Sequence, residues 1–248
     1  MLHGTQLTRR QAPPQSHLIE GYCLGHTEFI SRIHIIPGTN LLVSAGGDDW
    51  LGIWEWPAFK LKQKVRLSYD DIGDALSIPT AAAPAQYSRR MAVSGLWTIP
   101  LATEKDGMSQ ALMVSCERVS ALFVIPLDRL LNDTSAEPVH PIMRTEGPIL
   151  DAAIVNQSVV VSCDPASMGK RNNEGMQLKA YRFGLPLGPG LVWSASDDEL
   201  DKYLRALNEP SGAEMDDKKL NGFLYTVAQM RKRRDHEARE EVDGDDEE

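Results

Sequence analysis

His26, Ser44 and Asp48 have the side chains of a Ser-His-Asp hydrolytic triad and lie close together in one short segment. In such a triad the histidine takes the proton of the serine, and the aspartate orients the histidine. That chemistry needs an exposed serine, often on a strained turn between a strand and a helix. Ser44 instead follows the apolar residues 41–43 and precedes a Gly-Gly-Asp turn, which is typical of a strand entering a hairpin. The context therefore favours a structural hydrogen-bonded site.

The surrounding segment, residues 25–56, has the pattern of one WD-repeat propeller blade. It contains a Gly-His pair, an apolar strand, the Gly-Gly-Asp turn, a second strand and a Trp-Glu where Trp-Asp is usual. In such a blade four side chains form a buried hydrogen-bonded chain, and here these positions fall on His26, Ser44, Asp48 and Trp54. We expect Asp48 to accept hydrogen bonds from His26 and from nearby backbone N–H groups, since a buried carboxylate needs such donors.

The composition is that of an ordinary soluble globular protein. The chain has 248 residues, of which 42% are hydrophobic and 25% are charged, enough for one large or two small domains. No run of eighteen apolar residues predicts a membrane span, and the N-terminus has no apolar region typical of a secretory signal. Cys23, Cys116 and Cys163 are widely spaced and odd in number, which favours buried free thiols in a reduced compartment. No cysteine or histidine cluster predicts a metal site.

The net charge of −9 is concentrated at the C-terminus. Nine acidic residues and one arginine give residues 235–248 a charge of −8, which leaves −1 for the other 234 residues. We expect this tail to be disordered. The body of the protein is close to neutral, so its charge does not exclude binding to nucleic acid.

Apolar runs between turn residues predict an all-β protein with about three blades and one stray strand. Residues 1–16 are expected to be a disordered lead-in, and residues 17–24 the outer strand of a preceding blade. The predicted strands are 30–36, 41–44, 51–54 and 61–67 in the first blade, 91–97, 110–116, 121–126 and 141–144 in a degenerate second blade, and 149–155, 158–163, 177–183 and 191–193 in a third.

The remaining segments predict loops and a different C-terminal structure. Residues 71–88, 130–137 and 164–175 are polar or rich in turn residues and are expected to be loops. Residues 197–208 predict an amphipathic helix with an apolar stripe at Leu200, Tyr203, Leu204 and Leu207. The chain thus divides into a partial propeller over residues 17–194, a helical and basic closing segment over 195–234, and the acidic tail.

Three blades are too few to close a ring, because propellers have at least four. Terminal blades of an open ring leave unpaired edges and exposed apolar faces. We therefore expect this sequence to be the C-terminal part of a longer protein and Met1 not to be the natural start.

Two strings in the first blade are similar to one particular family. Residues 19–33, IEGYCLGHTEFISRI, and residues 41–56, LLVSAGGDDWLGIWEW, resemble the non-catalytic WD-repeat subunit of eukaryotic tRNA (guanine-N7)-methyltransferase. The resemblance extends in order to residue 234 but is weak beyond residue 86. It implies a seven-bladed propeller, without catalytic residues or a cofactor, that forms a nuclear heterodimer. The implied partner is a Rossmann-fold subunit that binds S-adenosylmethionine and methylates tRNA. The resemblance thus implies that this chain interacts with tRNA through the complex.

Residues just after the Gly-His pair are candidates for binding that partner. The resemblance implies that Arg32 is a salt-bridge donor to the catalytic subunit, a role that suits the planar, bidentate guanidinium. The residues alone leave open a solvated arginine at a strand end. Thr27, Glu28 and Phe29 lie on the same loop, and Phe29 is either an exposed anchor or a core residue.

Basic residues provide candidates for phosphate contacts. Lys60, Lys62, Lys64 and Arg66 alternate along a predicted strand, so period-two geometry predicts four side chains on one face. They either guard an exposed strand edge by their charge or form a stripe that contacts tRNA or the partner. Arg89 and Arg90 form a weaker candidate. The basic run 231–234 predicts a nuclear localisation signal, a phosphate contact or a helix C-terminus.

A second class of function is a generic WD-repeat adaptor for other proteins. A pull-down distinguishes this adaptor from the methyltransferase subunit, because the adaptor would not recover a Rossmann-type methyltransferase. An enzyme in its own right is disfavoured, because no paired carboxylates, glycine-rich nucleotide loop or metal-ligand cluster stands out in the sequence.

Overall fold

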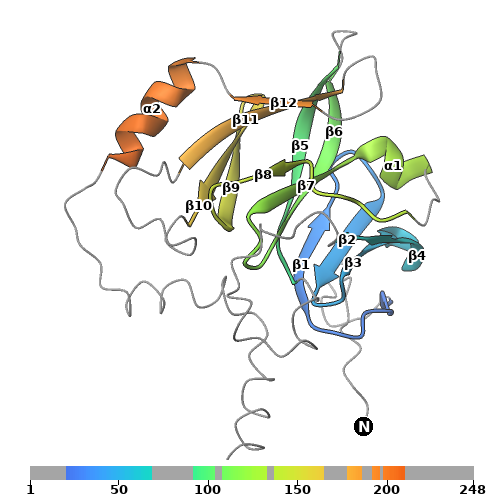
Figure 1. The fold of residues 1–248 in the computed structure, drawn as a ribbon. Helices are drawn as coiled ribbons and strands as arrows, with labels where there is room; N and C mark the ends of the chain where they lie inside the picture. Colours follow the sequence, from blue (N-terminus) through green and yellow to red (C-terminus); the bar gives the residue numbers. More distant parts are fainter. Residues whose placement is uncertain are drawn as a thin grey trace, which may run out of the picture.

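In the computed structural model, the described part of the protein forms three consecutive antiparallel sheet units (Figure 1). The structure describes residues 21–68, 92–103, 108–132, 137–164, 178–185, 192–195 and 198–209. Each unit is a meander of four strands in chain order, as expected for propeller blades. The fold is therefore all-β with open sheets, which agrees with a partial propeller.

The first blade contains four strands in the order β1-β2-β3-β4, with a short 3-10 helix before the last strand. The bounds are β1 Ile30–Ile35, β2 Leu41–Gly46, β3 Trp50–Glu55, η1 Trp56–Ala58 and β4 Lys60–Arg66. The turn between β2 and β3 places Asp49 at φ 61°, a left-handed conformation that aspartate tolerates better than most residues. All four strands lie within a residue or two of their predicted positions.

The second and third blades form one continuous sheet in place of two separate ones. The bounds are β5 Val93–Thr103, β6 Met108–Cys116, β7 Ala121–Pro126, β8 Met143–Arg144, β9 Ile149–Val155, β10 Ser158–Cys163, β11 Leu178–Leu185 and β12 Val192–Ala195. The junction is a short parallel pairing in which Gly184 lies opposite Ala102 and Leu185 opposite Thr103. The sequence did not predict this pairing, because β11 and β5 are far apart along the chain.

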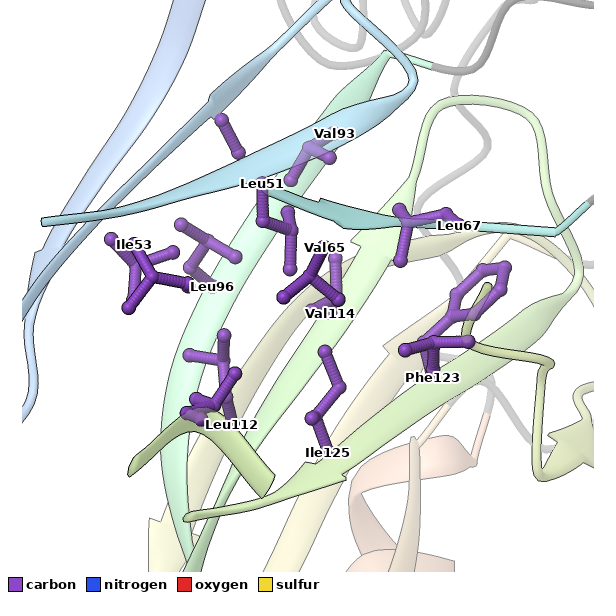
Figure 2. Packing of buried hydrophobic residues seen from close by; sticks show 14 of the residues in the cluster. Leu51, Ile53, Val65, Leu67, Val93, Leu96, Leu112, Val114, Phe123 and Ile125 are labelled. Atoms are coloured by element: carbon purple, nitrogen blue, oxygen red, sulfur yellow. The ribbon is translucent and has the colours of Figure 1, made fainter. Parts of the chain in front are cut away.

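Two hydrophobic cores between neighbouring blades hold the blades together. In the first core, residues of blade 1 such as Leu51, Ile53 and Val65 pack against Val114 and Phe123 of blade 2 (Figure 2). In the second core, the opposite face of blade 2 packs against blade 3. Successive residues of β6 and β7 alternate between the two cores, so these strands are buried on both faces. Burial on both faces explains why they read as continuous apolar runs without a WD signature.

Two short segments differ from the predicted loops and strands. Residues 130–137 were predicted to be a polar excursion, but α1 spans Leu127–Asn132 and Leu130 is fully buried in the first core. The polar residues nearby hid this apolar anchor and the flanking Leu127 and Leu131, which are partly buried against the same core. The strand predicted over 141–144 contains only Met143 and Arg144. Of the stray strand predicted at 17–24, only residues 21–24 are described, and among these four only Tyr22 forms a β-bridge.

The second helix, α2, spans Asp198–Asn208 and contacts β11. The predicted apolar stripe is only partly buried. Leu204 is 4% exposed, whereas Tyr203 and Leu207 are 71% and 69% exposed. The side chain of Asn208 accepts a hydrogen bond from the Leu178 N–H and donates one to the Leu178 carbonyl, both at 2.9 Å. Leu204 and the Asn208 side chain thus contribute to holding the helix against the third blade.

Candidate functional site

The four residues of the predicted WD signature form one hydrogen-bonded chain inside the first blade. His26 Nδ1 lies 2.7 Å from Asp48 Oδ2, and His26 Nε2 lies 2.7 Å from Ser44 Oγ. The Trp54 indole N–H donates to the same Ser44 oxygen at 2.8 Å. The side chains of His26 and Asp48 are 0% and 1% exposed. Ser44 itself is 1% exposed, so a substrate carbonyl cannot reach its hydroxyl. The hydrogen-bonded chain therefore serves as an internal support.

Asp48 also fixes the loop that follows His26. Its Oδ1 atom accepts hydrogen bonds from the Thr27 N–H at 2.9 Å, the Thr27 hydroxyl at 2.7 Å and the Glu28 N–H at 3.1 Å. Burial raises the pKa of Asp48, but the hydrogen bonds from Thr27 and the contact with His26 outweigh this effect. The pKa of the carboxyl group therefore lies below its ordinary value, and the aspartate is ionised at neutral pH.

The predicted partner-binding residues divide into supporting and exposed groups. The Thr27 hydroxyl is committed to Asp48, and Glu28 is held through its backbone, so both belong partly to the internal support. Phe29 is half-buried, and its carbonyl accepts a hydrogen bond from the Gly47 N–H at 3.0 Å. Arg32 is exposed, and its Nη1 donates to the Ser31 carbonyl at 2.9 Å. Arg32 is therefore the charged side chain of this segment that is best placed to meet another molecule.

Trp50 belongs to the same site, and the sequence reasoning missed it. Its ring stacks on His26 with centroids 4.2 Å apart and an interplanar angle of 0°. Lys64 Nζ lies 4.1 Å from the centroid of the Trp50 ring. The indole thus contacts both an imidazole ring and an ammonium group, and the ammonium contact is a favourable cation–π arrangement. An aromatic residue just after the tight turn was the available signal.

The predicted basic stripe on β4 is divided by a register shift. Lys60, Lys62, Lys64 and Arg66 are all exposed. However, the pairing of β3 with β4 shifts between Ile53 and Trp54, which leaves Lys62 as an extra residue. Lys64 pairs with Gly52, on the face of the hydrogen-bonded chain, whereas Lys60 pairs with Glu55 on the opposite face. The prediction that all four side chains point the same way is therefore wrong, because it assumed an uninterrupted period of two.

The other basic candidates, Arg89, Arg90 and the run 231–234, lie outside the described residues. Among the described residues, no group of three or more histidine, cysteine, aspartate or glutamate side chains is arranged to hold a metal ion. In the same part of the chain, no helix has the length and apolar character needed to cross a membrane.

The chain also matches a known protein family. Residues 8–181 match the family model described as the tRNA methyltransferase TRM82 WD40 domain. The chain belongs to this family. The match includes the whole first blade and continues into β11.

Curated relatives have the same family name. The chain is 31% identical over 242 residues to the tRNA (guanine-N(7)-)-methyltransferase non-catalytic subunit TRM82 of Phaeosphaeria nodorum, covering 89% of this chain and 46% of that protein. It is 26% identical over 238 residues to the protein of the same name from Coccidioides immitis, covering 90% and 45%. It is 28% identical over 237 residues to that of Aspergillus oryzae, covering 89% and 43%. The chain thus spans a little under half of the length of these relatives.

Proposed function

We propose that this chain is a non-catalytic scaffold of a tRNA (guanine-N7)-methyltransferase complex. In this role it binds a separate, S-adenosylmethionine-dependent catalytic subunit with a Rossmann fold and stabilises its active conformation. The observation that carries the proposal is the family match over residues 8–181, together with relatives named as non-catalytic subunits of this enzyme. We place the complex in the nucleus, where the basic run 231–234 would serve as the localisation signal.

The geometry of the first blade supports a scaffold role. The side chains with catalytic potential, His26, Ser44 and Asp48, are buried and hydrogen-bonded to one another. The exposed Arg32 lies close to them in sequence and is fixed on a strand. An exposed guanidinium on a strand is suited to a bidentate pair with a carboxylate of a partner protein. We therefore assign the partner contact to Arg32, flanked by Glu28 and Phe29, while tRNA is bound by the complex as a whole.

Reconstituted methylation tests this function. The catalytic subunit is assayed for N7-methylguanosine formation in tRNA, alone and with an equimolar amount of this chain. Scaffolding predicts a higher methylation rate in the mixture, a stable complex by gel filtration, and no methylation by this chain alone. No complex and an unchanged rate would leave the generic adaptor as the better function, and methylation by the isolated chain would contradict a non-catalytic role.

A further inference from the structure

Strand β1 contains a one-residue bulge at Ser31. Ile30 lies opposite Gly46 on β2, and Arg32 lies opposite Ala45, the very next position. Two steps along β1 therefore correspond to one step along β2. In an uninterrupted antiparallel ladder, Arg32 would lie opposite Ser44. The extra residue changes the face from which every later side chain of β1 projects.

The two faces of the first blade have different surroundings. Ala45 and Val43 of β2 belong to the first core, between blades 1 and 2. Ser44 and Leu42 project from the other face, toward His26 and Trp54. Directly opposite residues share a face. Arg32 therefore projects on the side of the second blade, and without the bulge it would project from the opposite face, the one that carries Ser44.

A second contact supports this assignment of faces. His34, two residues after Arg32, lies opposite Val43 and so projects from the same face as Arg32. Its Nε2 atom lies 2.6 Å from Thr98 Oγ1 on β5 of the second blade. Ile33 and Ile35 alternate with these residues and are each 50% exposed on the other face. Arg32 and His34 thus project from the face of β1 that lies toward the second blade, along the seam between the first two blades. Of these two residues, Arg32 is the exposed one.

The bulge is held by contacts to both blades. The Ser31 hydroxyl lies 2.5 Å from the Val93 carbonyl of β5 and 3.3 Å from the Ala45 carbonyl of β2. A hydroxyl has one proton, so the shorter contact with Val93 is the main hydrogen bond. Gly46 completes the fit, because a Cβ atom there would lie 1.7 Å from the Phe29 carbonyl oxygen. The Ser31 hydroxyl thus connects the bulge to the start of β5.

We propose that Ser31 is a positioning residue for partner binding, which holds the β1 bulge against β5 and thereby directs the Arg32 guanidinium to the seam between blades 1 and 2. The partner group is a carboxylate on the surface of the catalytic subunit. The hydrogen bond from Arg32 Nη1 to the Ser31 carbonyl adds to this orientation and leaves other N–H groups for the carboxylate. This inference rests on the proposed function, and it assigns a role to a residue whose hydroxyl contacts β5 and β2 within the protein.

A double-mutant cycle measures the coupling between the two residues. The Kd for the catalytic subunit is determined for the wild type, Ser31→Ala, Arg32→Ala and the double variant. We expect Arg32→Ala to weaken binding about 30-fold and Ser31→Ala about tenfold. If Ser31 acts through Arg32, Ser31→Ala has no further effect in the Arg32→Ala background. In the wild-type background, Ser31→Ala also reduces the salt dependence of the Kd, because the ion pair of Arg32 is no longer positioned.

Two further variants separate positioning from stability. Thr98→Val removes the contact with His34, another polar link between β1 and β5, and is expected to lower the melting temperature while leaving the Kd unchanged. Ser31→Thr keeps the hydroxyl and is expected to bind within about threefold of the wild type. It is the informative variant if Ser31→Ala does not fold, and a folded Ser31→Thr with a tenfold loss would overturn the proposal.

The outcomes distinguish this inference from the proposed function. The positioning role alone would be overturned if the wild type binds and Ser31→Ala leaves the Kd unchanged. It would also be overturned if Ser31→Ala weakens binding equally in the wild-type and Arg32→Ala backgrounds. Absence of any binding by the wild type would overturn the proposed function and this inference with it.

Discussion

At the scale of single residues, Asp48 is the centre of the first blade. One carboxylate receives hydrogen bonds from His26, from the Thr27 hydroxyl and from two backbone N–H groups. Replacing it would leave several buried donors without an acceptor, which costs more than the loss of one ordinary hydrogen bond. The WD signature therefore fixes the loop that carries the proposed partner-binding residues as well as the interior of the blade.

The lowered pKa of Asp48 predicts a pH-dependent stability difference from Asp48→Asn. Because the folded-state pKa lies below the ordinary value of 3.8, the carboxylate contributes its full stabilisation above that pH and loses it as the pH falls through the folded-state pKa. We expect Asp48→Asn to lower the free energy of unfolding by about 1–3 kcal/mol at pH 7. The difference should shrink below pH 4 in urea titrations. A difference that stays constant down to pH 3 would contradict the role of the ionised carboxylate.

The sequence predicted the members of this hydrogen-bonded chain because their spacing follows the hairpin. A Gly-His pair, a serine on the second strand and an aspartate in the next turn have defined relative positions once the strands pair. Thr27 and Trp50 were not predicted as members. Their roles depend on the loop conformation and on ring stacking, and neither has a characteristic spacing in the sequence.

At the scale of strands and helices, single extra residues decide which side chains meet. The bulge at Ser31 sends Arg32 toward the second blade, and the shift on β4 separates Lys60 from Lys64. Alternation of residue types predicted both strands but could not locate the bulges, because an inserted residue leaves the composition unchanged. The face of a charged residue therefore has to be taken from the strand register.

Docking of α2 depends mainly on Leu204. We expect Leu204→Ala to destabilise the docked helix by about 2–3 kcal/mol, since this buried side chain packs against the third blade. Leu207→Ala is the matched control on the same helix, because Leu207 is 69% exposed and its truncation should change stability by less than about 0.5 kcal/mol. Amide hydrogen exchange of α2 measures both effects. Equal loss of protection in the two variants would show that Leu204 is not the anchor.

At the scale of the whole molecule, the described residues form a row of blades with two buried cores between them. The second blade is covered on both faces, whereas Ile33 and Ile35 are half exposed on the far face of the first blade. The chain also spans a little under half of the length of its curated relatives. The strand composition predicted the number of blades, but the join between β5 and β11 depends on contacts between distant segments, which composition does not encode.

Cys116 and Cys163 are expected to report on the integrity of the two cores between blades. Cys116 lies in the first core and Cys163 in the second, and burial raises the pKa of both thiols, to about 11 for Cys163. Cys23 is 1% exposed, and burial raises its pKa as well. Because the thiolate is the reactive form, we expect no reaction with Ellman's reagent at pH 8 until urea unfolds the protein. Rapid labelling of Cys116 or Cys163 in the native protein would contradict the packing of the corresponding core.

The affinity of this chain for the catalytic subunit tests the central claim most directly. Isothermal titration calorimetry compares the wild type with Arg32→Glu and with Lys202→Glu, a matched charge reversal at an exposed position of α2. A scaffold that binds through Arg32 predicts a tight wild-type complex, a loss of at least about 30-fold for Arg32→Glu and a change within about threefold for Lys202→Glu. No binding by the wild type, or equal losses in the two variants, would contradict it.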